Sequence, residues 1–324
     1  MSEQLLRVDN LQTFFHTDEG VVKAVNGVSF TLNKGETLGV VGESGSGKSI
    51  LSMSIMGLIP TPPGVINGRI EFKGRNLLEI SESEYRQIRG NDMAMIFQEP
   101  MTSLNPVLTV GKQIMEVYKY HQKISPKEAK QRAIEMLRLV GIPKPEDRFN
   151  DYPHLLSGGM RQRVMIAIAL ACSPELLIAD EPTTALDVTI QAQILELMRE
   201  LKTEFNTALI LISHDFGVVS KVADKILIMY AGKVVEFATK EEVFSNPKHP
   251  YTEGLLSSIP NIKTPVDRLT TIPGTVPHPQ AFPKGCAFHP RCKYAMDICR
   301  QKEPTLTELS NGVQVSCWKH ERGE

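Results

Sequence analysis

One stretch of this 324-residue chain, residues 42–49, has the residue types and spacing needed to hold a polyphosphate. Its sequence, GESGSGKS, matches the pattern G-x-x-x-x-G-K-[S/T] at every fixed position. Glycines let backbone N–H groups curl around phosphate oxygens, and a helix that begins directly after them adds partial positive charge. The stretch, here called the phosphate loop, therefore predicts an ATP site, with a structural glycine turn as the alternative.

The side chains of the phosphate loop indicate how ATP would be bound. Lys48 is expected to reach the β and γ phosphates, and the Ser49 hydroxyl to bind Mg²⁺. Further contacts are expected from the rest of the loop, at Gly42, Ser44, Gly45, Ser46 and Gly47. The context favours ATP over a plain turn, because residues 36–41 have the pattern of a buried strand and residues 50–56 that of a helix start.

Polar residues also end three apolar runs further along the chain. Gln98 follows the run 93–97. An amide at the end of a buried strand can bind Mg²⁺ or the attacking water. Asp180 and Glu181 follow the run 176–179, so Asp180 is placed to bind Mg²⁺ and Glu181 to polarise the water as general base. His214 ends the run 208–213. Alone it would be a structural histidine, but beside this set we expect it to sense the γ-phosphate.

A second candidate phosphate cradle, here called the second half-site, lies at residues 156–160, with the sequence LSGGM. Ser157 can cap a helix, and Gly158 and Gly159 leave their backbone N–H groups open to a phosphate. By itself the pattern is weak, because Ser-Gly-Gly is more often an ordinary cap or turn. Asp187 is expected in a loop further on. The chain therefore carries two half-sites for phosphate.

The elements that must position these residues predict an α/β protein. Residues 5–15 and 25–32 have the pattern of antiparallel strands, within which Phe14 or Phe15 could stack on adenine or pack in the core. Residues 101–151 have a helical, more polar pattern, which predicts a helical insertion. The expected fold is a P-loop NTPase with a RecA-like core, an antiparallel β subdomain and a helical subdomain.

The composition restricts the possible partners and location. Thirty-six Lys and Arg residues against 37 Asp and Glu residues give a formal charge of −1, which argues against binding nucleic acid or a lipid surface through overall charge. The apolar run 164–172 is far shorter than the ~20 residues that span a bilayer. No secretory signal is apparent at the start of the chain, so we expect a cytoplasmic protein without a transmembrane helix.

The C-terminal residues differ in composition from the rest of the chain. Eight of the 21 prolines lie from Pro260 to Pro304, and four of the five cysteines follow the pattern C-x5-C-x6-C-x17-C, at Cys286, Cys292, Cys299 and Cys317. Such a segment needs a staple, and clustered cysteines favour a metal site over disulfides. The close spacing usual for zinc is absent, so a [4Fe–4S] cluster is favoured, with zinc, free thiols or disulfides as alternatives. We expect His249, His289 and His320 to be solvated or turn residues.

The motifs together resemble the ATPase subunits of ABC transporters, over roughly residues 5–258. Longer strings, at residues 97–106, 156–163 and 249–252, resemble the branch that energises oligopeptide and dipeptide importers. The resemblance implies a first domain at residues 1–258, with the helical insertion at about 101–172. It also implies a small, irregular, metal-stapled extension at residues 259–324. The segment 285–292 resembles that extension in peptide-importer ATPases, where an iron–sulfur cluster is implied.

The resemblance also implies roles for single residues. Gln98 corresponds to the loop that senses the membrane subunits, residues 156–160 to the signature sequence, and Asp187 to the loop that crosses between monomers. Phe15 corresponds to the aromatic adenine platform, with Phe14 as the alternative. The family signature commonly ends in Gln, whereas this chain has Met160. We expect activity to survive that change, because Ser157 and the two glycines remain.

The implied working complex is a head-to-tail dimer, in which the signature of one chain closes on ATP held by the other. The second ATPase is a copy or a paralogue, and the partners are two membrane permease subunits and an extracytoplasmic peptide-binding protein. The chain would then lie at the cytoplasmic face of the membrane. One alternative is a non-transport ABC ATPase acting on ribosomes or DNA, but no tandem cassette, coiled-coil insertion or basic surface is visible. Another is a metal-cluster protein with a regulatory nucleotide site.

Overall fold

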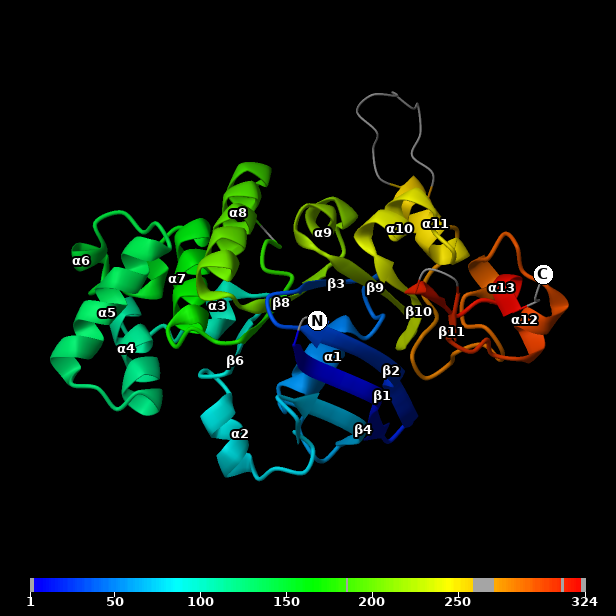
Figure 1. The fold of residues 1–324 in the computed structure, drawn as a ribbon, viewed down its shortest axis with the longest axis horizontal. Helices are drawn as coiled ribbons and strands as arrows, with labels where there is room; N and C mark the ends of the chain where they lie inside the picture. Colours follow the sequence, from blue (N-terminus) through cyan, green and yellow to red (C-terminus); the bar gives the residue numbers. More distant parts are fainter. Residues whose placement is uncertain (1–2, 185, 259–270, 310–311, 322–324) are drawn as a thin grey trace. The chain divides into compact units, whose positions relative to one another are not determined.

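The computed structural model describes residues 3–184, 186–258, 271–309 and 312–321, and the chain forms two compact units (Figure 1). The first unit is built mainly from Glu79–Ile212. The second is built from Gln4–Leu32, Thr37–Leu78 and the chain from Ser213 onward. The predicted site residues are divided between the units. The phosphate loop belongs to the second unit, and the paired acids Asp180 and Glu181 belong to the first.

The sheet of the first unit consists of parallel strands that are apolar up to the last residue of β7 and of β8. Its strand order is β8-β7-β6, with β6 at Met93–Ile96, β7 at Leu176–Asp180 and β8 at Ala208–Ser213. Every residue of β7 and β8 is buried. Continuous apolar runs of this kind are typical of parallel strands that are covered on both faces. Because β6 and β7 are parallel neighbours, the residues that follow them emerge at the same edge.

The helices of the first unit pack around one apolar helix, α7 (Gly158–Leu170). It contacts β6 and the helices α3 (Pro100–Ser103), α4 (Val110–His121), α5 (Pro126–Leu139) and α8 (Val188–Phe205). Three of its side chains, Val164, Ile166 and Ala167, have no exposed surface. The shorter elements of this unit are α2 (Glu82–Ile88), α6 (Pro145–Arg148) and the 3₁₀ helix η1 (Pro153–Leu155). Residues 101–172, predicted as a helical insertion, contain helices and no strand.

The second unit begins with an antiparallel sheet in the order β2-β1-β4-β5. The strands are β1 (Gln4–Thr17), β2 (Gly20–Asn33), β4 (Gly64–Phe72) and β5 (Arg75–Asn76), drawn from blue to cyan in Figure 1. β1 pairs antiparallel with β4, and α1 (Lys48–Ile55) packs against β1. This sheet is the antiparallel subdomain predicted from the alternating pattern of its strands.

A second sheet of this unit has the order β11-β12-β10-β9-β3. β3 (Thr37–Val41), which leads into the phosphate loop, is parallel to β9 (Lys225–Tyr230), and β10 (Lys233–Thr239) is antiparallel to β9. The edge strand is β11 (Thr307–Glu308), and it pairs with β12 (Gln314–Val315). The remaining elements are α9 (Phe216–Val222), α10 (Lys240–Ser245), α11 (Pro250–Ser257), the 3₁₀ helix η2 (His289–Arg291), α12 (Asp297–Gln301) and α13 (Trp318–Glu321).

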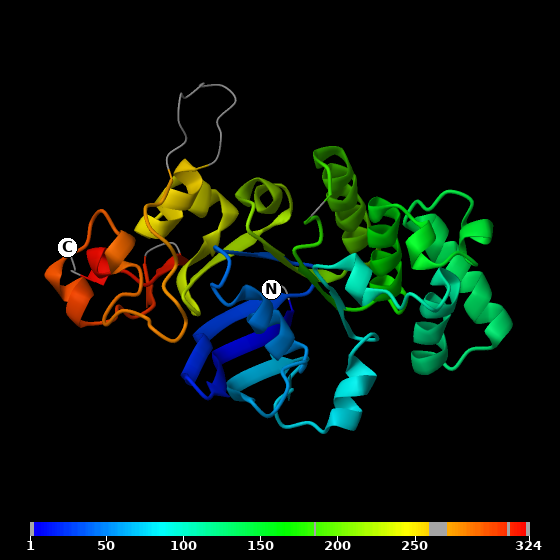
Figure 2. The same cartoon turned by 180° about the vertical axis from the view of Figure 1, so that it is seen from behind.

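The described part of the C-terminal extension, drawn in orange and red in Figure 2, is more integrated than the sequence predicts. Its strand β12 pairs with β10, with Val315 opposite Glu236. Phe288 of the extension is buried in one core cluster with Tyr230 and Tyr251 of the body. A proline-rich segment of this size cannot bury a core of its own, so it completes the core of its neighbour. The domain boundary predicted at residue 258 borders residues 259–270, outside the described residues, and stays a prediction.

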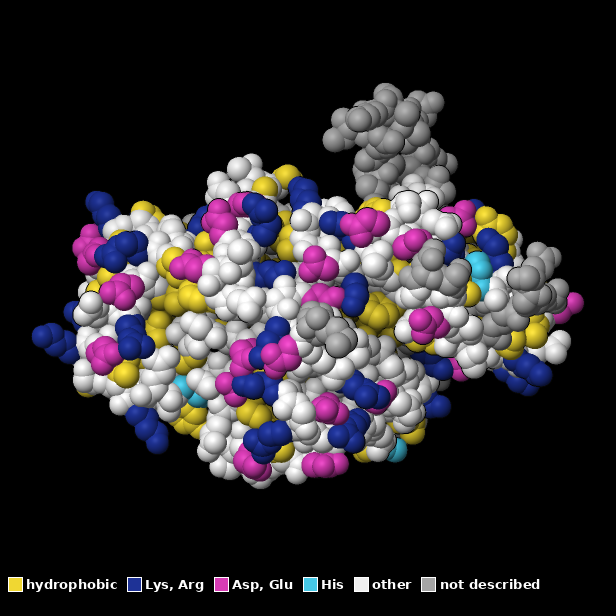
Figure 3. Space-filling model, in the orientation of Figure 1, with side chains coloured by type: hydrophobic (Ala, Val, Ile, Leu, Met, Phe, Trp, Pro, Cys, Tyr) yellow, Lys and Arg dark blue, Asp and Glu magenta, His cyan; other side chains and the backbone are white. Residues whose placement is uncertain are grey.

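The surface in Figure 3 carries basic and acidic side chains intermixed over the visible face, as the formal charge of −1 leads one to expect. Within the described ranges, no helix combines the length and the apolar character needed to cross a bilayer.

Candidate functional site

The phosphate loop is closed on itself by its own lysine. Lys48 is 5% exposed, and its Nζ donates to the carbonyl oxygens of Gly42 at 2.7 Å and Glu43 at 3.0 Å. Gly47, which caps α1, has a φ of +99°, where residues with a side chain are strained. A Cβ added at Gly42 would lie 2.3 Å from the carbonyl oxygen of Met229. Both glycines are therefore required by the backbone, and the loop ends on the N-terminus of a helix as predicted.

The other predicted residues of the second unit lie on α1, on β1 and directly after β8. Ser49 is the second residue of α1 and is half-buried. Phe15 lies on β1 opposite Gly64 and is half-buried, so its role as adenine platform stays a prediction. His214 is exposed and directly follows β8. The next residue, Asp215, caps α9 by accepting from the backbone N–H of Gly217 at 2.7 Å.

In the first unit, the structure brings together Gln98 and Glu181, which were predicted separately. The Gln98 side-chain amide donates to the Glu181 carboxylate at 3.2 Å, and the Thr184 hydroxyl donates to the same oxygen at 2.9 Å. Asp180 is the last residue of β7 and is 5% exposed. These residues meet because β6 and β7 are parallel neighbours.

The backbone of Glu181 is unusual. Its φ is +47°, in the left-handed region that residues other than glycine, asparagine and aspartate rarely adopt. Its N–H donates to the carbonyl oxygen of Ile212 at 3.0 Å, which holds the residue in place. Such a conformation costs of order 1–3 kcal/mol and clusters at functional sites. The observation supports the sequence-based choice of Glu181 as a residue with a chemical role.

The second half-site is the N-terminus of α7. Ser157 caps this helix by accepting from the N–H of Met160 at 3.3 Å, and Gly158 is its first helical residue. The helix therefore begins where the cap at Ser157 was predicted. Asp187, predicted in a loop, lies directly before α8 and caps it, accepting from the N–H groups of Thr189 and Ile190 at 3.1 and 3.0 Å. Aspartate is a preferred N-cap residue, so its identity was an available signal.

The two helix starts are in close contact. α7 packs against α8, and a Cβ added at Gly159 would lie 2.9 Å from Cγ2 of Ile190. The first unit thus contains the Gln98–Glu181 pair and two capped helix N-termini, whereas the second contains the phosphate loop and His214.

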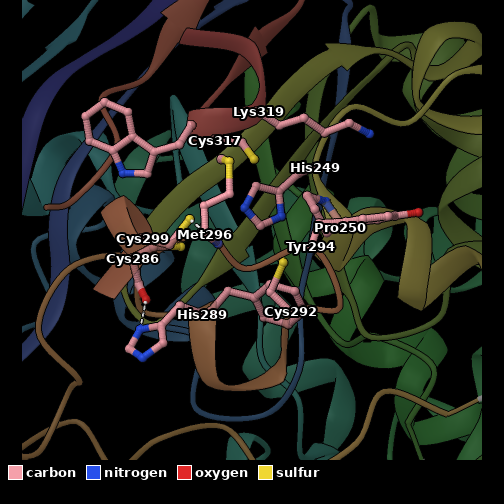
Figure 4. Close-up of a pocket in the computed structure, with 12 residues that line it drawn as sticks. His249, Pro250, Cys286, His289, Cys292, Tyr294, Met296, Cys299, Cys317 and Lys319 are labelled. Atoms are coloured by element: carbon pink, nitrogen blue, oxygen red, sulfur yellow. Dashed lines mark hydrogen bonds between the residues drawn. The ribbon is translucent and has the colours of Figure 1, made fainter. Parts of the chain in front are cut away.

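All four clustered cysteines line one cavity, here called the cysteine cavity, shown in Figure 4. Met296 and His249 also line it. The four thiols are free, and burial raises the pKa of Cys286 to about 12 and raises that of Cys292 and Cys317. Across the described residues, no group of three or more His, Cys, Asp or Glu side chains is arranged to hold a metal ion.

One of the histidines expected to be solvated is buried. His249 is 2% exposed and caps α11, with its Nδ1 accepting from the N–H of Tyr251 at 3.0 Å. Burial lowers the pKa of His249 to about 3, so the imidazole is neutral at pH 7. His289 and His320 bond to carbonyl oxygens, of Cys286 at 2.9 Å and of Lys248 at 3.0 Å. His249 packs against Phe288 of the extension, with ring centres 5.7 Å apart, and no local pattern indicates this contact.

One contact at the phosphate loop was missed altogether. Arg291 of the extension forms a two-pronged ion pair with Glu43, at 2.7 and 3.0 Å. The two residues are 248 positions apart. No local pattern could have indicated this pairing.

A phosphate loop, a strand that ends in paired acids and a serine-capped second half-site define an ATPase of the ABC class. The family described as "ABC transporter" matches residues 25–184. A solved ATP-binding cassette, a dimer in a post-hydrolysis state bound to ADP and Pi, is 27% identical with a TM-score of 0.65, and the match covers 72% of this chain and 98% of that one.

The comparisons also identify the branch. The family described as "Oligopeptide/dipeptide transporter, C-terminal region" matches residues 235–299. The oligopeptide transport ATP-binding protein AppD of Bacillus subtilis is 56% identical, over 98% of this chain and 97% of its own length. The dipeptide transport ATP-binding protein DppD of Escherichia coli is 52% identical, over 97% and 96%. The chain belongs to the ABC transporter family, in the group of ATP-binding subunits with this C-terminal region.

Proposed function

We propose that this chain hydrolyses ATP to drive the import of dipeptides or oligopeptides through separate membrane permease subunits. The similarity to peptide-transport subunits along nearly the whole chain supports this best. This similarity includes the extension. By contrast, the match to the solved cassette takes in 98% of the cassette but only 72% of this chain. The feature that distinguishes this chain from a general cassette is therefore the one shared with the peptide-transport relatives.

The chemistry follows from the residues of the two units. The phosphate loop binds the polyphosphate, with Lys48 as counter-charge, and Ser49, Gln98 and Asp180 bind Mg²⁺ directly or through water. Glu181 acts as general base on the attacking water. The Gln98 amide donates to its carboxylate at 3.2 Å, which positions this group. His214 contacts the γ-phosphate, and Phe15 stacks on adenine.

A single chain has one copy of each half-site, so we propose a head-to-tail dimer with a copy or a paralogue. Ser157, Gly158 and Gly159 then face the γ-phosphate held by the other chain, and Asp187 lies at the crossing between the chains. The solved cassette with the same fold is itself a dimer. The permease partners place the dimer at the cytoplasmic face of the membrane, and a peptide-binding protein delivers the substrate from outside.

We also propose that the cysteine cavity holds a [4Fe–4S] cluster, with zinc as the alternative. The fit rests on the donor set, because Cys286, Cys292, Cys299 and Cys317 line one cavity from four separate places along the extension. Four thiolates are the usual ligands of such a cluster. A bound cluster would supply a covalent staple between these segments. Iron and acid-labile sulfide should be found in anaerobically purified protein, whereas stoichiometric zinc without iron would contradict the cluster.

Transport is tested by copurification and reconstitution. The chain, expressed with its neighbouring membrane partners, should copurify with two permease subunits and support ATP-dependent uptake of labelled peptides into vesicles. Vesicles that contain the Glu181→Gln variant are the matched control and should not accumulate peptide. Copurification with ribosomes or DNA instead, together with ATP turnover unaffected by peptides, would favour the non-transport alternative.

A further inference from the structure

Glu43, the second residue of the phosphate loop, is bound through all of its polar groups. Its backbone N–H donates to the Tyr251 hydroxyl at 2.9 Å, and its carbonyl oxygen accepts from Lys48 at 3.0 Å. Its carboxylate accepts two hydrogen bonds from Arg291, at 2.7 and 3.0 Å. The phosphate-binding pattern leaves this position open to any residue, so an acid here is a feature of this chain.

Arg291 is fixed on the side of the extension. Its side chain is 5% exposed, and its Nε donates to the carbonyl oxygen of Pro273 at 2.9 Å. The guanidinium lies 5.9 Å from the ring centre of Tyr230 and contacts its hydroxyl at 3.5 Å. A planar guanidinium with this many partners keeps one orientation, and its two parallel bonds to a carboxylate are geometrically specific.

Aromatic packing connects this pair to the rest of the second unit. Tyr251, which binds the backbone of Glu43, packs edge-on against Tyr230, with ring centres 4.7 Å apart. Phe288, three residues before Arg291, packs against both tyrosines at 5.2 and 5.3 Å. The extension, α11 and β9 thus meet directly beside the phosphate loop.

The pairing has an electrostatic consequence for ATP. A carboxylate in a loop that binds a polyphosphate repels it, and the repulsion is strong where water is partly excluded. The Glu43 side chain is 32% exposed, so solvent screens its charge only in part. The guanidinium of Arg291 lies at hydrogen-bonding distance from the Glu43 carboxylate and compensates its negative charge. Lys48 and the N–H groups of the loop can then attract the phosphates without repulsion from Glu43.

We propose that Arg291 is a positioning residue for ATP binding, which acts by neutralising the Glu43 carboxylate of the phosphate loop. The extension, in addition to any structural role, then sets the affinity of the nucleotide site. This inference rests on the ATP binding by the phosphate loop proposed above.

The test is a double-mutant cycle on the full-length chain, with Mg-ATP affinity measured by calorimetry. Arg291→Met, which keeps the length of the side chain but removes its charge, should weaken ATP binding about tenfold, equivalent to 1.4 kcal/mol. Adding Glu43→Gln to that variant should restore the affinity to within about threefold of wild type, because no carboxylate is left to repel the phosphates.

The single variant Glu43→Gln separates charge neutralisation from general stability. It should lower the melting temperature, because it leaves the buried Arg291 charge unpaired, yet bind ATP as tightly as wild type or more tightly. A purely structural role predicts that stability and affinity fall together. This variant also keeps the test decisive if Arg291→Met fails to fold.

The matched control is Lys293→Met, which breaks the exposed pair of Lys293 with Glu253, at 2.8 Å, in the same extension. It should change ATP affinity by less than about twofold, because exposed pairs contribute little. Wild-type affinity in Arg291→Met, or a double variant as weak as Arg291→Met alone, overturns the inference. Failure of the wild-type chain to bind ATP would instead refute the proposed function.

Discussion

The two half-sites for phosphate are held in different ways. The phosphate loop is fixed by residues far away in the sequence, since Glu43 bonds to Tyr251 and Arg291, which are 208 and 248 positions further on. The second half-site is fixed locally, since Ser157 caps its helix through a bond to Met160 only three positions away. One is built into the core of its unit, and the other is a helix end that forms by itself.

The surroundings of the second half-site are also more open. Leu155, one residue before it, is 59% exposed, and Val188, at the start of the adjoining α8, is 82% exposed. Both exposed side chains are available to a partner chain. In the proposed dimer, one chain binds ATP alone, whereas hydrolysis needs the second half-site of another chain. Variants in the two regions should therefore separate binding from turnover.

The largest effect is expected at Glu181. Glu181→Gln should lower ATP turnover about 10³-fold, because it removes the general base, while ATP affinity stays close to wild type. The variant should also accumulate as an ATP-bound dimer, seen by gel filtration with nucleotide. Glu204→Gln, at an exposed position of α8, is the control and should retain full turnover. Undiminished turnover in Glu181→Gln would remove Glu181 from the mechanism.

Lys48→Ala should act on binding itself. It deletes the counter-charge to the phosphates and the two bonds that close the loop, so ATP affinity should fall about 100-fold. Titration with a fluorescent ATP analogue measures the change, and circular dichroism checks that the variant is folded. Unchanged affinity would show that the phosphate loop is not the nucleotide site.

The difference between the half-sites also explains what could be predicted from the sequence. The phosphate loop, the strand-end residues Gln98, Asp180 and Glu181, and the cap at Ser157 are local signals, each readable from a few neighbouring residues. The contact of Gln98 with Glu181, at 3.2 Å, depends instead on the pairing of β6 with β7, which the structure shows. The fold class followed from the same local patterns.

The missed features depend on tertiary packing. No sequence pattern places Arg291 on Glu43, and nothing local to His249 shows that the extension covers it. The extension was expected to be irregular, because its prolines exclude long helices, but short strands such as β12 form where an existing sheet edge offers a partner. Asp187 lies in the predicted loop, and its role as N-cap of the following helix was also readable, since aspartate is a preferred N-cap residue.

Gly159→Ala is expected to affect only the second half-site. Its Cβ would lie 2.9 Å from Cγ2 of Ile190, so α7 and α8 must shift apart, and turnover should fall about tenfold. ATP affinity of the single chain should be unchanged, because the phosphate loop is untouched. Adding Ile190→Ala removes the clashing methyl group and should restore part of the turnover. A parallel loss of ATP affinity would contradict the separation of binding from turnover.

The smallest effect on the nucleotide site is expected from the cysteine cavity. Cys299→Ser should lower the iron content of anaerobically purified protein, because it removes one of four proposed ligands. ATP affinity should change by less than about threefold, since Arg291 is anchored by Pro273 and Tyr230 rather than by the thiols. Cys172→Ser, the fifth cysteine and outside the cavity, should keep its iron. An ATP affinity that falls about tenfold with the iron would show that the cluster itself, and not the fold of the extension alone, holds Arg291 on the phosphate loop.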